Sequence, residues 1–586
     1  MIKRFAHILL LLFALQAKGQ YYLRGEVRDE KNQPLTNVRI ILLSSHYTYS
    51  SGAGGGFGIT TNVLNDSLQL SLEGYETRTV KVRADQWQQL TLNVLSSTSS
   101  RNRPKLISVT KDLNRTTRLR WLVNDETYFQ LVENEHVDAS KFPNTGFSLN
   151  VNKASYSNVR RFLNMQSAVP PDAVRTEELV NYFNLHYHEP KPGDIFNMET
   201  QLSSCPWDAG RQLLFLNINA RKLDMNRIPP GNFVFLIDVS GSMDLPNRLP
   251  LLKAAFQLLV KNLRTIDTVS IVTYGGGVSI KLQPTGGNEK EKILKAIEEL
   301  EANGDTPGEA AIMTAYKLAE TTFNKDGNNR VILATDGDFN VGQTSEKALE
   351  ELISREKQTG VYLTCLGVGM GNFKDSKLQA LAKRGNGNFA YLDDINEAEK
   401  VLVKELTQTF YAVADDVFMN IRFNPAQVKQ YRLIGFDNRR DAVADNNLDM
   451  EGGEIGSGNS VIAVFEIIRD SAGSNQSAMD TTIANLSLQY SLCNDTVHKE
   501  LNMVCPDNYV EFRNLDREYR FATAVLMFSL KLKQSKYIKN ADWEDIETIG
   551  VDAYDINNYL QTEFLTLVGK AKKLYTTRKK KKKGED

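Results

Sequence analysis

The stretch NFVFLIDVSGSMD, residues 232–244, constrains the fold more than any other part of this 586-residue chain. Five apolar residues, Phe233 to Ile237, follow one another without a break after Pro229, Pro230 and Gly231. A continuous apolar run of this kind predicts a strand buried on both faces of a parallel sheet. Ligands of open α/β sheets bind outside the carboxyl ends of the strands, so the polar end of this strand is expected to carry a site.

The candidate site residues lie on three predicted loops. Asp238, Ser240 and Ser242 follow the apolar run at i, i+2 and i+4 and offer one carboxylate and two hydroxyls. Thr306 precedes a predicted helix in GDTPGEAA, and Asp336 ends a second apolar strand in VILATDGDFN. Hydroxyl and carboxylate oxygens are hard donors, which suit Mg²⁺ or a similar small divalent cation.

These five positions resemble the metal-ion-dependent adhesion site (MIDAS) of von Willebrand factor type A (VWA) domains, whose first loop reads D-x-S-x-S. The resemblance implies that Ser240, Ser242 and Thr306 coordinate Mg²⁺ (or Mn²⁺ or Ca²⁺), while Asp238 and Asp336 bind it directly or through water. It also implies a protein partner that offers an Asp or Glu side chain to the metal. Strands and helices alternate through this region, which predicts a doubly wound, Rossmann-like α/β sheet.

Three other interpretations compete with a metal-dependent interaction site. Asp238, Ser240 and Ser242 could cap the following helix, as Asp and Ser commonly do. A metal-independent envelope scaffold would keep the fold without the ion. A metal-dependent hydrolase is disfavoured, because the chain has no G-x-S-x-G around Ser240, no H-E-x-x-H, and no P-loop Lys after Gly275 to Gly277. The chain is therefore expected not to be an enzyme.

His186 and His188, in NLHYHEP, could pair on a metal. They alternate at what the sequence predicts to be the end of a strand, beside Pro190, so we expect surface or packing roles for them.

The first 19 residues have the pattern of a cleaved secretory signal: basic Lys3 and Arg4, an apolar core, and small Ala17 and Gly19. The chain is thus expected to be exported, to the periplasm or the outer cell surface. Its net charge of −1 gives no indication of a nucleic-acid partner. In an exported chain Cys493 and Cys505 could form a disulfide across a hairpin, a question the sequence leaves open, whereas Cys365 is expected to be a buried thiol.

The N-terminal part predicts short strands separated by turns. It resembles the carboxypeptidase regulatory-like β-sandwich through G-x-V-x-D at Gly25 to Asp29, P-L-x-x-V at Pro34 to Val38, and GGFGI. The Thr-Asp usual before the last Gly-x-Phe is replaced by Ala53, Gly54 and Gly55. We expect this domain to act as a spacer or docking module.

The regions on either side of the α/β module resemble those of a family of exported bacterial VWA proteins. The motifs are A-S-Y-x-N-V-R-R at Ala154 to Arg161, V-R-x-E-E-L-x-N-Y-F at Val174 to Phe183, and the stretches from Val428 to Arg439 and from Gly452 to Ile467. A helix from Ser155 to Leu163 is expected, followed by one capped at Asp172.

The expected fold class is therefore multidomain, with a β-sandwich, a doubly wound α/β VWA domain and mixed α+β flanking regions. The expected order is a signal peptide (1–19), the sandwich (20–95), a linker (96–125), a VWA-preceding region (126–228), the VWA domain (229–405), a C-terminal flanking domain (406–575) and a solvated, unstructured basic tail (576–586). The sequence leaves the oligomeric state open.

Overall fold

The computed structural model describes residues 21–30, 32–52, 54–72, 75–93, 118–120, 126–149, 152–224, 228–304, 308–337, 346–370, 373–437, 453–469, 482–492 and 497–582. The chain divides into two compact units, residues 1–104 and 105–586. The expected signal peptide, most of the linker, and Thr306 and Cys493 lie outside the described residues. No described helix is long and apolar enough to cross a bilayer.

The first unit is a β-sandwich. One sheet has the order β4-β1-β7 and the other β3-β2-β5-β6. Alternate residues point inward, as with Leu23 and Val27 of β1 and Leu68 and Leu70 of β5, and the two sheets share one apolar core. The strands are β1 (Tyr21–Asp29), β2 (Arg39–Leu42), β3 (Thr48–Ser50), β4 (Gly56–Thr61), β5 (Asn65–Ser71), β6 (Arg78–Arg83) and β7 (Trp87–Leu92).

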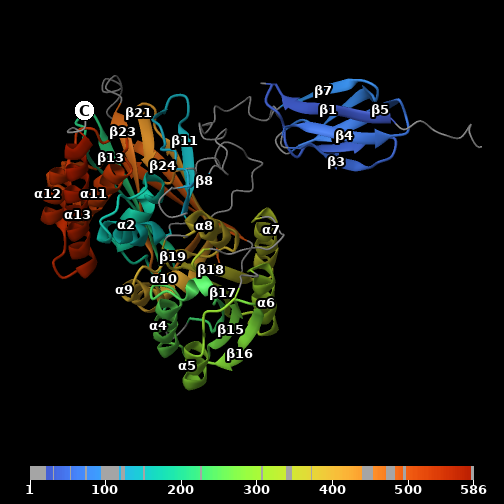
Figure 1. The fold of residues 1–586 in the computed structure, drawn as a ribbon. Coiled ribbons are helices and arrows are strands. Elements are labelled where there is room, and N and C mark those ends of the chain that lie inside the picture. Colours follow the sequence, from blue (N-terminus) through green and yellow to red (C-terminus); the bar gives the residue numbers. More distant parts are fainter. Residues whose placement is uncertain are drawn as a thin grey trace, which may run out of the picture. The chain divides into compact units, whose positions relative to one another are not determined.

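The second unit contains a six-stranded α/β sheet of order β16-β15-β14-β17-β18-β19, whose strands β15 to β19 are labelled in Figure 1. Its strands are parallel except for β16, which pairs antiparallel with β15. The strands are β14 (Gly231–Asp238), β15 (Thr268–Tyr274), β16 (Val278–Gly286), β17 (Asn328–Thr335), β18 (Val361–Gly367) and β19 (Phe389–Tyr391).

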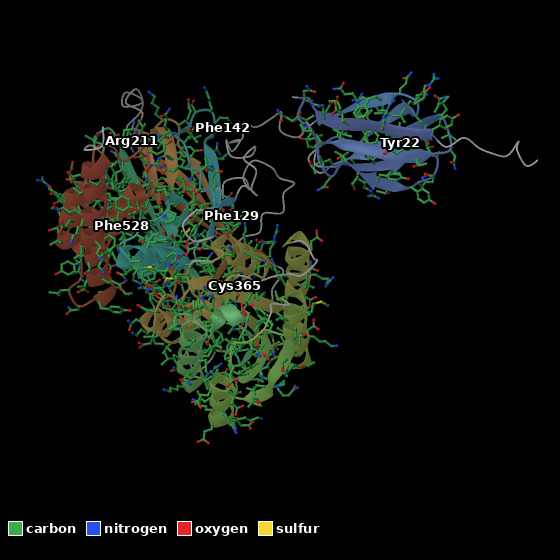
Figure 2. All side chains as sticks on the ribbon, in the orientation of Figure 1. Tyr22, Phe129, Phe142, Arg211, Cys365 and Phe528 are labelled. Carbon is green, nitrogen blue, oxygen red and sulfur yellow. The ribbon has the colours of Figure 1, made fainter. Side chains whose placement is uncertain are left out.

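Helices cover both faces of this sheet, because β14 is apolar on both sides. Phe233, Phe235 and Ile237 pack in a core with α4, α5 and α9, while Val234 and Leu236 pack in another with α6, α7 and α8. Cys365 is a buried thiol of β18, as predicted (Figure 2). The helices are α4 (Leu249–Lys261), α5 (Lys290–Glu298), α6 (Gly308–Thr321), α7 (Glu346–Lys357), α8 (Asp375–Arg384), α9 (Ile395–Glu399), the π-helix η5 (Lys400–Lys404) and α10 (Leu406–Phe410).

Strands from before and after the α/β module share two further sheets. The six-stranded sheet β10-β21-β23-β13-β12-β26 packs against a five-stranded sheet that contains β11-β20-β24-β25, with β22 paired to β20. The strands of these two sheets are β10 (Val137–Asp138), β11 (Asn144–Ser148), β12 (Phe196–Ser204), β13 (Gln212–Ala220), β20 (Ala412–Phe423), β21 (Val428–Ile434), β22 (Gly453–Gly456), β23 (Ser460–Arg469), β24 (Thr482–Ser491), β25 (His498–Pro506) and β26 (Tyr509–Val510). Two further strands, β8 (Arg118–Arg120) and β9 (Thr127–Phe129), pair with each other in a separate two-stranded sheet.

A layer of helices covers the other face of the six-stranded sheet (Figure 1). Leu213 and Phe215 of β13 pack in the helical core, which also contains Phe528, whereas Leu214 and Leu216 face the other sheet. The elements of this layer are α2 (Ala154–Asn164), η2 (Pro171–Ala173), α3 (Thr176–Val180), η3 (Asn181–Phe183), η8 (Phe512–Asn514), α11 (Arg517–Leu532), α12 (Trp543–Ala553) and α13 (Tyr559–Lys582). The regions on both sides of the α/β module thus build one three-layer structure; the boundaries assigned from sequence stay predictions.

Three local expectations need comment. The prediction that Asp172 caps a helix is wrong: it lies in the 3-10 turn η2 and accepts a hydrogen bond from the Leu131 backbone N–H (3.0 Å), while α3 begins only at Thr176. The basic tail is helical as far as Lys582, because lysine is a good helix former and α13 continues into it. Cys505 is a buried free thiol in the β24–β25 hairpin.

Candidate metal centre at the end of strand β14

Asp238 is the last residue of β14 and is buried where the strand leaves the sheet. Its Oδ1 accepts a hydrogen bond from the Ser240 backbone N–H (2.9 Å), and its Oδ2 accepts one from the Thr335 hydroxyl at the end of β17 (2.8 Å). Parallel strands bring these two ends together, as the register of β14 and β17 requires. The carboxylate is therefore fixed at the sheet edge before any ligand binds.

The two serine hydroxyls lie side by side on the loop after Asp238. Ser240 Oγ and Ser242 Oγ are 3.2 Å apart, and Ser242 Oγ donates to Asp336 Oδ2 at 2.9 Å. Ser240 precedes the 3-10 turn η4 (Gly241–Met243) and makes no side-chain capping hydrogen bond. The interpretation that these residues cap the following helix is therefore wrong for Ser240. Four of the five predicted residues, Asp238, Ser240, Ser242 and Asp336, lie close together.

Thr306, the fifth predicted residue, lies outside the described residues, but the chain leading to it is held at the same place. The Gly241 N–H donates to the Gly304 carbonyl (3.1 Å), and the Asn303 N–H donates to the Val239 carbonyl (2.6 Å). Gly304 has φ +77°, and a Cβ there would lie 2.3 Å from the Gly276 Cα. Only glycine fits this crossing of two loops.

Arg248 is part of the centre and was not found from the sequence. Its Nη1 donates to both Asp336 Oδ2 and the Ser242 carbonyl, each at 2.6 Å, and its Nη2 donates to the Met370 carbonyl at 3.0 Å. The side chain is buried, and a Cβ on Gly369 would clash with it. A single basic residue at a helix start gives no sequence signal that distinguishes it from a surface charge.

The site is electrostatically unusual because two carboxyl groups are buried together. Burial raises the pKa of Asp238 to about 6, and the neighbouring Asp336 adds to the increase, while the hydrogen bonds from Ser240 and Thr335 oppose it. Burial and the same two carboxyl groups hold the pKa of Tyr274 well above its ordinary value. Such surroundings favour the arrival of a positive charge.

The oxygen spacing tests whether a small cation fits these residues. Octahedral Mg²⁺ with bonds of about 2.0–2.1 Å requires neighbouring donor oxygens to be about 2.9 Å apart. The separations of 3.2 Å between Ser240 Oγ and Ser242 Oγ, and of 2.9 Å between Ser242 Oγ and Asp336 Oδ2, are close to that edge. The donors are hard oxygens, so the residues present fit a magnesium-like ion.

Comparison with known proteins agrees with the architecture. The family model "von Willebrand factor type A domain" matches residues 233–339, "von Willebrand factor" matches 122–215, and "Uncharacterized protein YfbK, C-terminal" matches 408–574. YfbK of Escherichia coli (strain K12) is 37% identical over 464 residues, which cover 75% of this chain and 80% of that protein. The chain belongs to the YfbK family of VWA domain proteins. VWA domains are in general protein-interaction modules. All three regions of this YfbK-family chain that match a family model lie in its second unit.

More distant relatives match a smaller share of the chain. The magnesium-chelatase 67 kDa subunit of Chlorobaculum parvum is 24% identical over 248 residues, 37% of this YfbK-family chain and 39% of that subunit. Among solved structures, the von Willebrand factor type A protein from Catenulispora acidiphila is 14% identical, with a TM-score of 0.40, covering 63% of this chain and 88% of its own.

Proposed function

We propose that this protein binds an acidic side chain of a protein partner through a divalent cation, Mg²⁺ or alternatively Mn²⁺ or Ca²⁺. Asp238, Ser240, Ser242, Thr306 and Asp336 would hold the ion. The observation that carries the proposal is the cluster of Ser240, Ser242 and Asp336 oxygens at octahedral spacing beside buried Asp238. A bound divalent cation supplies a Lewis-acidic position that accepts a partner's carboxylate.

The chain's own residues prepare this position. Hydrogen bonds from Ser240 and Thr335 orient the Asp238 carboxylate, and the Ser242 side chain is exposed enough for a partner to approach. The ligand set has three neutral hydroxyls and only two carboxylates, and Arg248 already pairs with one carboxylate, that of Asp336. These ligands would therefore leave a divalent ion incompletely neutralised. An anionic partner group completes the charge balance.

The alternatives make different predictions. A metal-independent scaffold would retain its partner after chelation and in an Asp238 variant. A metal-dependent hydrolase would cleave an ester, phosphate or peptide only with metal present. The interaction role is favoured because VWA domains generally mediate protein contacts and because the described site places two serines and two aspartates around one point without a nucleophile–base pair.

We further propose that the protein works in the cell envelope, in the periplasm or on the outer surface. The support is the signal-like sequence of residues 1–19. The sandwich, with its resemblance to carboxypeptidase regulatory-like domains, would then serve as the spacer or docking module. Cell fractionation together with the N-terminal sequence of the mature protein tests this location, and a cytoplasmic protein with an intact N-terminus would refute it.

The decisive experiment is calorimetric titration of Mg²⁺ and Mn²⁺ into the metal-free protein. We expect about one ion per chain, binding lost in Asp238→Asn, and binding weakened at least about tenfold in Ser242→Ala, which removes one ligand from an exposed position. Asp244→Asn is the matched control, because Asp244 is an exposed carboxylate two residues beyond Ser242 and outside the ligand set.

Capture of partners then tests the clamp itself. Proteins retained by the wild type with Mg²⁺ should be released by a chelator and should not bind Asp238→Asn. Retention that survives both treatments would favour the scaffold over the clamp. An absence of ion binding in the wild type, together with chelator-resistant capture, would remove the metal from the mechanism.

A further inference from the structure

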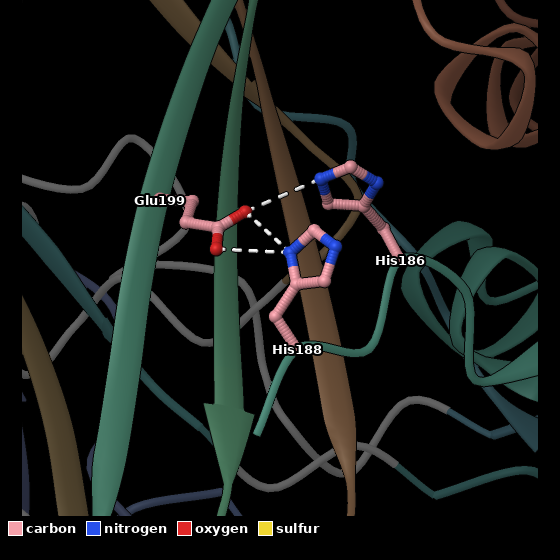
Figure 3. A group of neighbouring side chains, drawn as sticks. All are labelled: His186, His188 and Glu199. Carbon is pink, nitrogen blue, oxygen red and sulfur yellow. Dashed lines mark hydrogen bonds and ion pairs between the residues drawn. The ribbon is translucent and has the colours of Figure 1, made fainter. Parts of the chain in front are cut away.

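A second cluster of side chains that could hold a metal ion lies on elements that precede the VWA domain in the sequence. His186 and His188 sit on the loop after η3, and the carboxylate of Glu199, from β12, points toward both imidazole rings (Figure 3). His186 Nε2 is 3.2 Å from Glu199 Oε2, and His188 Nδ1 is 2.9 Å from Glu199 Oε1. The expectation that these histidines alternate at a strand end is wrong, because the chain turns at His186 and brings both rings to one side.

The turn that brings the rings together is held by specific hydrogen bonds. His186 has φ +53°, a conformation that a non-glycine residue rarely adopts. Its backbone N–H donates to Glu518 Oε2 (2.5 Å), its carbonyl accepts from the Asn217 amide (2.6 Å), and its ring packs on Tyr519 with centroids 4.2 Å apart. The first imidazole is therefore positioned by contacts that do not involve Glu199.

Further polar groups lie behind two of the three side chains. The second ring nitrogen of His186, Nδ1, faces Asp516 Oδ1 at 3.6 Å and Glu518 Oε2 at 4.0 Å. Asn197 Nδ2 donates to Glu199 Oε1 at 2.8 Å. Histidines that ligate metals commonly direct their other nitrogen at a carboxylate, which fixes the tautomer and raises the basicity of the ligand. Asp516 and Glu518 also help to balance a divalent charge.

We propose that His186 Nε2, His188 Nδ1 and a Glu199 carboxylate oxygen form a binding site for Zn²⁺ or a cation of similar preference. A tetrahedral ion with bonds of about 2.0 Å requires ligand atoms about 3.3 Å apart, and the two histidine–glutamate separations are close to this value. Two imidazoles and one carboxylate select transition metals over Mg²⁺, which prefers oxygen ligands.

The site leaves one coordination position open to solvent. His188 is 55% exposed and Glu199 33% exposed, so an ion can enter, and a water molecule or a partner's side chain can complete the tetrahedron. The ion would join the loop after η3 to β12. Asp516 and Glu518, at the start of α11, would supply carboxylates behind the ligand His186. This is a different chemistry from the oxygen-only centre beside β14.

Zinc titration against a chromophoric competing chelator tests the site in the full chain after removal of metals. We expect one Zn²⁺ per chain, at least about 100-fold weaker binding in His188→Ala, and a comparable loss in Glu199→Gln, which keeps the shape of the side chain. Asp516→Asn should weaken binding by about tenfold through the outer position. Cobalt substitution should give the intense visible bands of a tetrahedral site in the wild type and not in His188→Ala.

His498→Ala is the matched control, because His498 is also exposed (71%) and lies 4.0 Å from a carboxylate oxygen of Asp416. His498→Ala should leave zinc affinity unchanged, and so should Asp238→Asn. Conversely, Asp238→Asn should abolish Mg²⁺ binding, whereas His188→Ala should retain it. The proposal is overturned if the wild type binds no zinc, or if His188→Ala and Glu199→Gln, shown to be folded by circular dichroism, bind it as well as His498→Ala does.

Discussion

Arg248 places a permanent positive charge on one of the proposed metal ligands. Its guanidinium group shares Asp336 Oδ2 with the Ser242 hydroxyl, at 2.6 Å and 2.9 Å. It therefore reduces the negative charge available to a cation while it keeps the Asp336 carboxylate in position, and these two effects on metal affinity oppose each other.

We expect the charge effect to be larger, so that Arg248→Gln binds Mg²⁺ about tenfold more tightly. Removing one positive charge next to a ligand changes the interaction with a divalent ion by more than 1 kcal/mol even at an effective dielectric constant of about 20, and glutamine retains a donor for the Ser242 carbonyl. Calorimetric titration measures the change. Lys317→Gln, an exposed residue of α6, removes the same charge elsewhere in the VWA domain and should leave the affinity unchanged. Weaker binding in Arg248→Gln would mean that positioning of Asp336 dominates.

The sequence predicted Asp238, Ser240, Ser242 and Asp336 because they lie at the ends of two apolar strands or on the loop that follows, and parallel strands end at one edge of the sheet. It could not predict Arg248, which reaches the centre only through the start of α4. The sequence offered His186 and His188 as a possible metal pair but favoured surface or packing roles for them, because Glu199 and the carboxylates near the start of α11 come next to His186 through tertiary folding alone.

At the scale of elements, β23 carries a buried acid that ties together three parts of the chain. Glu466 Oε2 lies 2.8 Å from Arg432 Nε of β21, 2.9 Å from Arg211 Nη1 and 3.2 Å from His136 Nε2, and Oε1 accepts from the Trp207 indole (3.2 Å). Burial alone would raise the pKa of Glu466, but the contacts with His136 and the two guanidinium groups outweigh it and lower the pKa to about 2.

The lowered pKa of Glu466 makes the stability of the folded protein depend on pH. A carboxyl group whose pKa falls from its ordinary 4.5 to about 2 on folding stabilises the protein above about pH 4.5, and the contribution disappears as the pH falls toward 2. The shift corresponds to about 3 kcal/mol. Glu466→Gln should therefore be about 3 kcal/mol less stable at pH 7, with a difference from wild type that shrinks steadily below pH 4.5.

Urea unfolding at pH 7, 5, 4 and 3 measures this difference. Glu500→Gln, an exposed carboxylate on β25, is the control and should stay within about 0.5 kcal/mol of wild type at each pH. A difference between Glu466→Gln and wild type that is the same at pH 7 and pH 3 would show that folding does not lower the pKa of Glu466.

Element types follow from local pattern, whereas several boundaries do not. The strand β14 is readable from the sequence because an apolar run that is buried on both faces has no polar period. The start of α3 was misplaced because Pro171 and Asp172 resemble a helix beginning, yet the Asp172 side chain is taken by the Leu131 backbone. That competition is a tertiary contact, which sequence spacing does not contain.

At the scale of the whole chain, the VWA module is inserted into a structure built from its two flanks. β12 and β13 come before it in the sequence, β21 and β23 come after it, and all four share one sheet. Pairings across more than 200 residues leave no local signal, which is why the sequence separates these regions into two domains. The sheet that the two flanking regions share is visible only in the folded structure.

Buried ion pairs join this structure to the VWA module. Arg160 of α2 reaches Asp393 Oδ1 (2.5 Å) and Glu397 Oε2 (2.7 Å) in the VWA module, and Glu563 Oε2 (3.1 Å) on α13. Arg175 similarly meets Asp375 at the start of α8, at 2.6 Å. Removing one partner from a buried pair leaves an uncompensated charge and typically costs about 3–5 kcal/mol. The flanks and the VWA module should therefore unfold together.

We expect calorimetry of the full chain to show two transitions, one for the sandwich and one for the second unit, because the chain divides into two compact units. Arg160→Met should lower only the second by about 3–5 °C, since for a unit of this size about 1 kcal/mol corresponds to about 1 °C. Arg355→Met, which removes a largely exposed arginine of α7, should change neither. A separate VWA transition, or an Arg160→Met effect confined to part of the second unit, would show instead that the VWA domain folds independently of its flanks and that the buried pairs only dock it.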